Sequence, residues 1–222
     1  MNTDNITVNT QSSIRIEGSK VLYFDPFQIG QEKADADIIL ITHEHYDHFD
    51  PDSIANIMKE DTVLVIPAGM EAEVKKLAGS RQIICMKPGE KKIVSACGGS
   101  DVEATKASAI TVEAVAAYNK LKPFHPRRNQ WLGYIVTMDG LRYYVAGDTD
   151  ALSELGTIVC DVALLPIGGM YTMTAKDAAN LVNVMRPKVA IPTHYGSIVG
   201  KAEDADAFRS RVNDGILVVT KL

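Results

Sequence analysis

Residues 42–48 read Thr-His-Glu-His-Tyr-Asp-His and directly follow the apolar run Ile-Ile-Leu-Ile at 38–41. The run is rich in β-branched residues and has the length of a strand, so it predicts a buried strand at 37–41 that ends at the histidines. Side chains at i and i+2 of an extended segment share a face, which places His43 and His45 side by side. Asp47 and His48 follow where the chain must turn, and they can offer a carboxylate and an imidazole to a second point close by.

This stretch predicts a metal site. A single histidine is more often an ordinary surface or core residue, but three histidines and an aspartate at one strand end have no simple packing explanation. Burying them together without a metal would leave several polar groups unpaired, at a cost of about 1–3 kcal/mol each. Neutral imidazole and carboxylate are the ligands that zinc and its neighbouring divalent metals prefer. Because only five of the 222 residues are histidine, composition does not account for the cluster.

Size, composition and charge narrow the class of protein. A chain of 222 residues with 46% hydrophobic residues predicts one α/β domain over 1–222 with a sizeable core. The net charge of −5 disfavours nucleic acid as a partner and leaves a small-molecule substrate. No apolar run approaches the length of a membrane span, so no membrane partner is expected. The three cysteines, Cys85, Cys97 and Cys160, are scattered and the first residues lack a secretory signal, which together predict reduced thiols and a cytoplasmic protein. A homo-oligomer is left open.

The order of elements predicts two packed sheets covered on the outside by helices. A helix should begin at Asp50-Pro51, with the aspartate as N-cap and proline in the first turn. Asp139-Gly140 predicts a tight hairpin between 131–138 and 141–146. The middle of the chain, 91–117, should be β-rich with a turn at Gly98-Gly99. The other predicted strands are 13–16, 21–24, 62–66, 82–86, 161–166, 189–192 and 216–220, and the other predicted helices are 68–77, 174–185 and 202–212.

Two more predicted strands end in metal-type residues. Asp148 follows the apolar segment 143–146, and Gly147 before it allows a close backbone approach. An isolated Gly-Asp is usually a turn, but a carboxylate can bridge two cations, and this one ends a strand as the histidine cluster does. His194 follows the strand at 189–192. Because ligands gather where strand ends and their loops converge, the three segments are expected to meet in one crevice.

With these three segments, the chain resembles the metallo-β-lactamase superfamily. The stretch 43–48 matches its HxHxDH motif, and Asp148 in Ala-Gly-Asp-Thr and His194 in Pro-Thr-His-Tyr-Gly match the later metal motifs in the right order. Within the superfamily it is similar to the UlaG-type branch of small stand-alone metal-dependent hydrolases. The segments that support this are 25–27 (Asp-Pro-Phe), 117–119 (Ala-Tyr-Asn), 165–169 (Leu-Pro-Ile-Gly-Gly) and 171–173 (Tyr-Thr-Met). The resemblance implies an α/β fold: a four-layer αββα sandwich with two mixed β-sheets flanked by helices.

The resemblance also implies a ligand set for two divalent ions, zinc first, with manganese or iron as alternatives. His43 and His45 would bind the first ion, Asp47, His48 and His194 the second, and Asp148 both. Asp25 would orient a ligand imidazole. The third ligand of the first ion is left open: it is either His125, within a predicted loop at 120–130, or Asn119.

The implied activity is hydrolysis of an ester-type bond, in a lactone, a thioester or a phosphodiester. Two ions that share a carboxylate hold a water between them and lower its pKa toward about 7. Asp47, His125 and Tyr195 are the expected catalytic residues, and Tyr171, Asn119 and Arg127 are further candidates for holding the substrate. The alternative function is a metal-binding sensor or scaffold of the same fold without turnover.

Overall fold

The computed structural model describes residues 2–95 and 110–222, in which thirteen strands form two mixed sheets. The expected turn at Gly98-Gly99 and Cys97 lie outside the described residues. The first sheet has the order β1-β2-β3-β4-β5-β6 and the second the order β13-β12-β11-β10-β9-β8-β7. The strands of the first sheet are β1 (Ile6–Val8), β2 (Ile14–Glu17), β3 (Val21–Phe24), β4 (Ala36–Leu40), β5 (Met58–Pro67) and β6 (Ile83–Met86). Those of the second are β7 (Lys91–Val94), β8 (Ile110–Ala116), β9 (Leu132–Met138), β10 (Leu141–Val145), β11 (Val162–Pro166), β12 (Val189–Thr193) and β13 (Leu217–Val218).

Each sheet has an antiparallel part and a parallel part. Strands β1 to β3 are antiparallel and β3 to β6 parallel, while β7 to β10 are antiparallel and β10 to β13 parallel. The hairpin of β9 and β10 turns through Asp139 and Gly140, both at positive φ (53° and 76°), as a tight two-residue turn requires. The parallel strands have their carboxyl ends at one edge of each sheet, which is where the predicted metal ligands follow.

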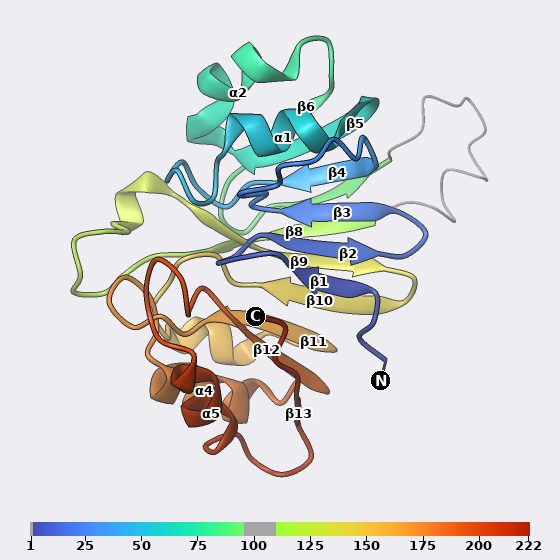
Figure 1. Ribbon diagram of the computed structural model, residues 1–222. Coiled ribbons are helices and arrows are strands. Elements are labelled where there is room, and N and C mark those ends of the chain that lie inside the picture. Colours follow the sequence, from blue (N-terminus) through green and yellow to red (C-terminus); the bar gives the residue numbers. More distant parts are fainter. Residues whose placement is uncertain (1, 96–109) are drawn as a thin grey trace.

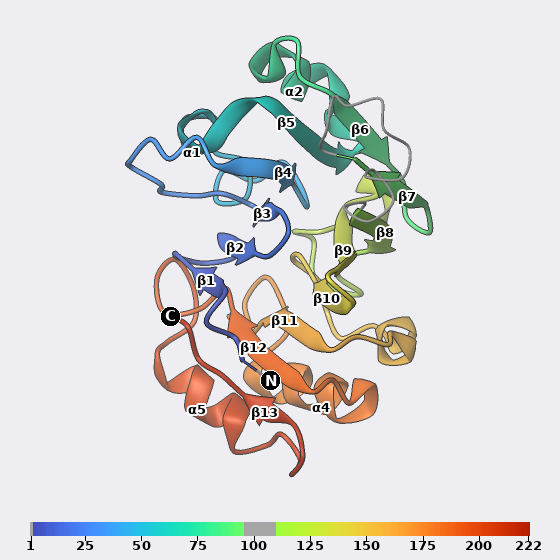
Figure 2. The same ribbon diagram turned by 90° about the vertical axis from the view of Figure 1, so that its right-hand side faces the viewer.

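Helices cover the outer face of both sheets, so the molecule is built in four layers (Figures 1 and 2). The helices α1 (Pro51–Ile57) and α2 (Glu71–Ala78) pack on the first sheet, and α4 (Ala175–Met185) and α5 (Glu203–Arg209) on the second. A central apolar cluster, which includes Ile38, Leu40, Tyr134 and Val145, fills the space between the sheets. The predicted αββα sandwich is confirmed. Three short 3₁₀ turns, η1 (Ala68–Met70), η2 (Arg127–Asn129) and η3 (Ser153–Thr157), complete the described elements.

The helix caps follow the sequence. The Asp50 side chain accepts a hydrogen bond from the backbone N–H of Asp52, and Pro51 occupies the first turn of α1. Thr174 and Asp177 form a complete capping box at the start of α4. The first of these caps fixes where the histidine segment ends and α1 begins.

Element boundaries differ from the prediction in several places. Strand β5 begins at Met58 rather than at 62, and its pairing with β4 is irregular between Ala36 and Ile38. The predicted helix 68–77 is split into η1 and α2, with the poor helix former Gly69 in its first turn. Strand β1 was not predicted, because three residues are too short for a periodic signal. None of the helices in 2–95 and 110–222 has the length and apolar character needed to cross a bilayer.

Candidate metal centre

Four of the expected ligands lie on one short connection between β4 and α1. After β4, the backbone N–H groups of His48 and Phe49 both donate to the carbonyl oxygen of His45, at 2.9 and 2.8 Å. This turn brings Asp47 and His48 back toward His43 and His45, and Asp50 then starts the helix. Loop and helix cap together place two pairs of ligands within a few residues.

Asp148 and His194 reach the same place from the second sheet. Gly147, between β10 and Asp148, has φ +63°, and a Cβ there would lie 2.7 Å from the carbonyl oxygen of Leu132. His194 follows β12 with φ +56°, and its backbone N–H donates to the carbonyl oxygen of Gln11 at 2.9 Å. Asp25 also has a positive φ, of 44°. Backbone conformations of this kind in non-glycine residues cost about 1–3 kcal/mol and are found preferentially at functional sites.

The histidines and aspartates form three overlapping groups whose ligand atoms lie within 4.8 Å of one another. The groups are His43–His45–His125, His43–His48–Asp148 and Asp47–His48–His194. Asp148 joins them: its Oδ2 lies 3.3 Å from Nε2 of His125 and 3.4 Å from Nε2 of His194, and its Oδ1 lies 3.4 Å from Nε2 of His48. The structure thus brings together the six residues that the sequence analysis predicts as metal ligands. His125, one of the two candidates left open there, lies with them, so that all five histidines of the chain meet here.

The donor atoms fit divalent cations. His43, His48, His125, Asp148 and His194 are each at most 4% exposed. Nε2 of His125 and Oδ1 of Asp148 are buried without a hydrogen-bond partner in the described part of the chain. Nε2 of His48 and Nε2 of His194 face each other at 3.2 Å. A metal ion would satisfy the two buried unpartnered atoms, and a donor set of imidazole and carboxylate suits zinc and related metals.

The imidazoles of His48 and His125 are each oriented by a hydrogen bond at Nδ1, the ring nitrogen that does not point into the cluster. Oδ2 of Asp25 accepts a hydrogen bond from Nδ1 of His48 at 2.7 Å, and Asp25 is itself held by the N–H and hydroxyl of Thr42, both at 2.7 Å. Oδ1 of Asn119 accepts a hydrogen bond from Nδ1 of His125 at 3.0 Å. Because a carboxylate or amide oxygen accepts, each Nδ1 carries the proton, and each Nε2 is left for a metal.

Of the two candidates left open for the third side chain of the first group, the structure places His125 in the cluster and turns Asn119 away. Nδ2 of Asn119 donates to Oδ1 of Asp150 at 3.1 Å and to the carbonyl oxygen of Tyr171 at 2.9 Å. Asp150 also accepts from Nζ of Lys122 at 2.9 Å, and Lys122 contacts the carbonyl oxygens of Gly169 and Thr172. The sequence analysis missed Asp150 as a support of this loop; the signal was a second acid two residues after Asp148.

The model of the β-lactamase superfamily domain matches residues 5–194, most of the chain. The chain belongs to this superfamily. Among curated relatives it is 32% identical over 216 residues to a UPF0173 metal-dependent hydrolase of Thermococcus kodakarensis, covering 92% of this chain and 90% of the relative. A second such hydrolase, of Pyrococcus abyssi, is 31% identical over 223 residues, with the same coverage.

Solved structures share the architecture. A crystal structure of a candidate metal-dependent hydrolase from Parabacteroides distasonis has a TM-score of 0.75 at 33% identity, and covers 98% of this chain and 92% of its own. Igni18, a metallo hydrolase of Ignicoccus hospitalis, has a TM-score of 0.71 at 21% identity over 97% of this chain and 93% of its own, a likeness of fold alone.

Charges in this superfamily site are strongly coupled. Burial, with the neighbouring His48, holds the pKa of His43 well below its ordinary value. Burial alone would do the same to His48, but the carboxylates of Asp148 and Asp25 outweigh it and raise the pKa of His48 well above the usual value. Burial opposes ionisation of Asp148, yet the imidazoles of His194 and His48 lower its pKa well below the usual value. Without metal, the centre therefore favours an ionised Asp148 next to a protonated His48, and a cation can take the place of that proton.

A pocket of about 250 Å³ opens onto the ligands. It is lined by His45, Tyr46, Asp47, Phe124, His125, Asp148, Tyr171, His194 and Ile198. Tyr195, one of the expected catalytic residues, does not line it. The Tyr195 ring is buried in the apolar cluster beneath α4 and α5, and its hydroxyl has no hydrogen-bond partner in the described residues, so the structure does not support a substrate contact for this residue.

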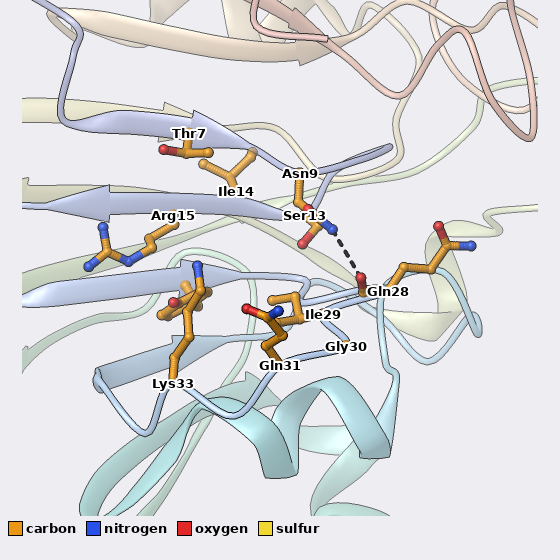
Figure 3. A pocket seen from close by; sticks show the side chains of 11 residues that line it. Thr7, Asn9, Ser13, Ile14, Arg15, Gln28, Ile29, Gly30, Gln31 and Lys33 are labelled. Carbon is orange, nitrogen blue, oxygen red and sulfur yellow. Dashed lines mark hydrogen bonds between the residues drawn. The ribbon is translucent and has the colours of Figure 1, made fainter.

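The pocket in Figure 3 is a separate feature. It lies along β1 and β2 beside residues 28–33, and Nδ2 of Asn9 donates to the carbonyl oxygen of Gln28 at 3.3 Å across it. The cation Arg15 in it is already paired with Glu17 and Asp35. None of the possible metal-holding groups in the described residues lies there. The histidine cluster is therefore the candidate reactive site of the described residues.

Proposed function

We propose that this protein is a metal-dependent hydrolase whose two divalent ions support cleavage of an ester-type bond in a small molecule. The observation that carries the proposal is the position of Asp148. Its two oxygens lie 3.3–3.4 Å from imidazoles of both ligand groups, which supports a carboxylate that would be shared by two ions. The curated relatives are named as metal-dependent hydrolases, which supports the same class of activity.

The ligand atoms divide into two sites. His43, His45 and His125 would hold the first ion and Asp47, His48 and His194 the second, with Asp148 shared. Zinc is the proposed metal, because the set is rich in imidazole, and manganese or iron would accept the same ligands. When bound, such a pair supplies a water of lowered pKa as nucleophile and a positive field for the oxyanion.

The residues of the chain supply positioning and proton transfer. Asp47 lines the pocket, and its Oδ2 lies 3.3 Å from Nε2 of His194, so the carboxylate can accept a proton from the attacking water while it stays at the second site. Asp25 and Asn119 hold their imidazoles in one tautomer and one orientation. Lactones, thioesters and phosphodiesters are the proposed bonds.

The test is hydrolysis of a panel of simple carboxylic esters, lactones, thioesters and bis-phosphodiesters by metal-loaded protein. Turnover that a chelator abolishes and zinc or manganese restores is expected. The matched control is the Asp148→Asn variant, which keeps the fold but lacks the bridging charge. A protein that binds two ions tightly and turns over no member of the panel would instead be a metal-binding sensor or scaffold.

A further inference from the structure

The wall of the pocket that faces the ligands is apolar. Phe124 and Tyr171 meet edge to face, with ring centroids 4.6 Å apart and planes at 84°. Tyr46 meets Phe27 in the same way at 6.0 Å and 74°. Ile198 adds an aliphatic side chain from the segment after β12. Tyr46, Phe124, Tyr171 and Ile198 come from four separate loops, so the apolar wall belongs to the pocket and to no single element.

Three of these side chains are exposed although their size favours burial. Tyr46 is 65% exposed, Phe124 43% and Ile198 40%. Leu121 and Met170, adjoining the same loops in sequence, are 96% and 64% exposed. Apolar groups gathered in this way around a concave site usually mark the place where a ligand covers them.

The lining lacks lysine and arginine. Apart from the candidate metal ligands, the described residues that line the pocket carry no charge. Lys122, two residues before Phe124, is held by Asp150 and backbone carbonyl oxygens, and the guanidinium of Arg127 lies over the ring of Tyr118 at 5.2 Å. A phosphate or carboxylate remote from the metals would therefore lie against this wall without a partner, which is costly.

We infer that the pocket takes an uncharged ester or thioester that bears an aryl group, with the ring packed against Phe124, Tyr171 and Ile198. This inference rests on the proposed function for the reacting bond. In that reaction water adds to the carbonyl carbon, the bond to the leaving oxygen or sulfur breaks, and the products are a carboxylate, a proton and an alcohol or thiol. The volume of about 250 Å³ lies just below the usual range of small-molecule pockets, about 300–1,000 Å³, and so favours a substrate with a single ring.

The test uses hydroxamates, which bind metal ions but are not esters, so binding is measured without turnover. Benzohydroxamate, 4-methylbenzohydroxamate, 4-carboxybenzohydroxamate and acetohydroxamate are titrated calorimetrically into the zinc-loaded protein. We expect the first two to bind at least about ten times more tightly than acetohydroxamate, and the carboxylated ring to lose most of that gain. Equal affinity for all four, or tightest binding of the carboxylated ring, would overturn the inference.

Variants locate the ring. Phe124→Ala and Tyr171→Ala should each remove the tighter binding of benzohydroxamate, while the affinity for acetohydroxamate stays the same. Phe124→Leu should keep part of the preference for benzohydroxamate. Ile93→Ala, at an exposed apolar residue of β7, is the control and should change nothing. An aryl preference that survives both alanine variants would contradict the assignment. If aryl hydroxamates bind as expected but no ester is hydrolysed, the proposed function fails and the aryl site stands. If only charged esters are turned over efficiently, the proposed function stands and the aryl site fails.

Discussion

The amide oxygen of Asn119 accepts two hydrogen bonds from His125, one from its backbone N–H at 3.1 Å and one from ring Nδ1 at 3.0 Å. The pair fixes the ring so that Nε2 points at Asp148. Asn119 is held in turn by Asp150, which Lys122 also contacts. The loop between β8 and β9 therefore holds the His125 ring in one orientation through these hydrogen bonds.

His125→Ala should lose one of two bound ions together with activity, because the structure makes His125 a member of the first ligand group. Asn119→Ala should retain both ligand groups but bind metal about 10–100 times more weakly, as is usual when the partner of a ligand histidine is removed. Metal per chain after dialysis, followed by chelator competition, measures both. The exposed Asn213 offers a matched Asn→Ala control. A His125→Ala variant with two ions and full activity would make His125 an ordinary buried histidine.

Asp148→Asn should prevent binding of two ions, since an amide cannot offset two dications. We expect the affinity for the second ion to fall by more than about 100-fold, beyond the range for residues that only orient ligands. Asp214→Asn, at an exposed position, is the control. Asp150→Asn is unsuitable as a control, because Asp150 supports Asn119 and Lys122. Equal metal content in the Asp148 and Asp214 variants would show that Asp148 is only a turn residue.

Trp131, the only tryptophan of the chain, should report metal binding. Its ring lies 4.9 Å from those of His43 and His45, and its Nε1 donates to Glu44 at 3.2 Å. Adding Co²⁺ to the metal-free protein should quench the fluorescence of Trp131 in proportion to the amount of metal bound. Zn²⁺ should change this fluorescence less. Trp131→Phe should abolish the signal while metal content stays unchanged. Emission that ignores both metals at full occupancy would place the ions elsewhere.

The free energy of unfolding of the metal-free protein should fall in acid as Asp37 is protonated. Asp37 lies in β4 and forms ion pairs with Lys20 and Lys59. Burial by itself would raise the pKa of Asp37, but Lys59 at 2.7 Å, the N–H of Val21 at 2.7 Å and Lys20 outweigh it, so the pKa is lowered. A carboxylate with a lowered folded pKa stabilises above the unfolded value, about 3.9, and loses that contribution as the pH falls through the folded pKa. Urea unfolding should therefore show Asp37→Asn less stable than wild type at pH 7, with the difference shrinking as the pH falls below about 3.9. A gap independent of pH would indicate a role unrelated to charge.

Strand-end chemistry made most of the site predictable from sequence. The apolar run at 38–41, and those before Asp148 and His194, mark buried strands by composition alone, and strand ends with their loops commonly converge on one crevice, here between two packed sheets. Tyr195 could not be placed in this way. It follows His194, whose positive φ redirects the chain, so its ring enters the core while the imidazole faces the ligands. The choice between Asn119 and His125 depended on loop hydrogen bonds across 31 residues, from Asn119 to Asp150, which no local pattern records.

The ligands divide between the two sheets of the sandwich. His43, His45, Asp47 and His48 follow β4 of the first sheet, whereas His125, Asp148 and His194 lie on connections of the second. Ions held in this way would cross-link the two halves of the molecule, so that each ion at 100 times its dissociation constant would add about 2.7 kcal/mol to the free energy of unfolding. The lifetime of the protein against proteolysis would then follow the free metal concentration around it, and metal starvation would remove the protein as well as its activity.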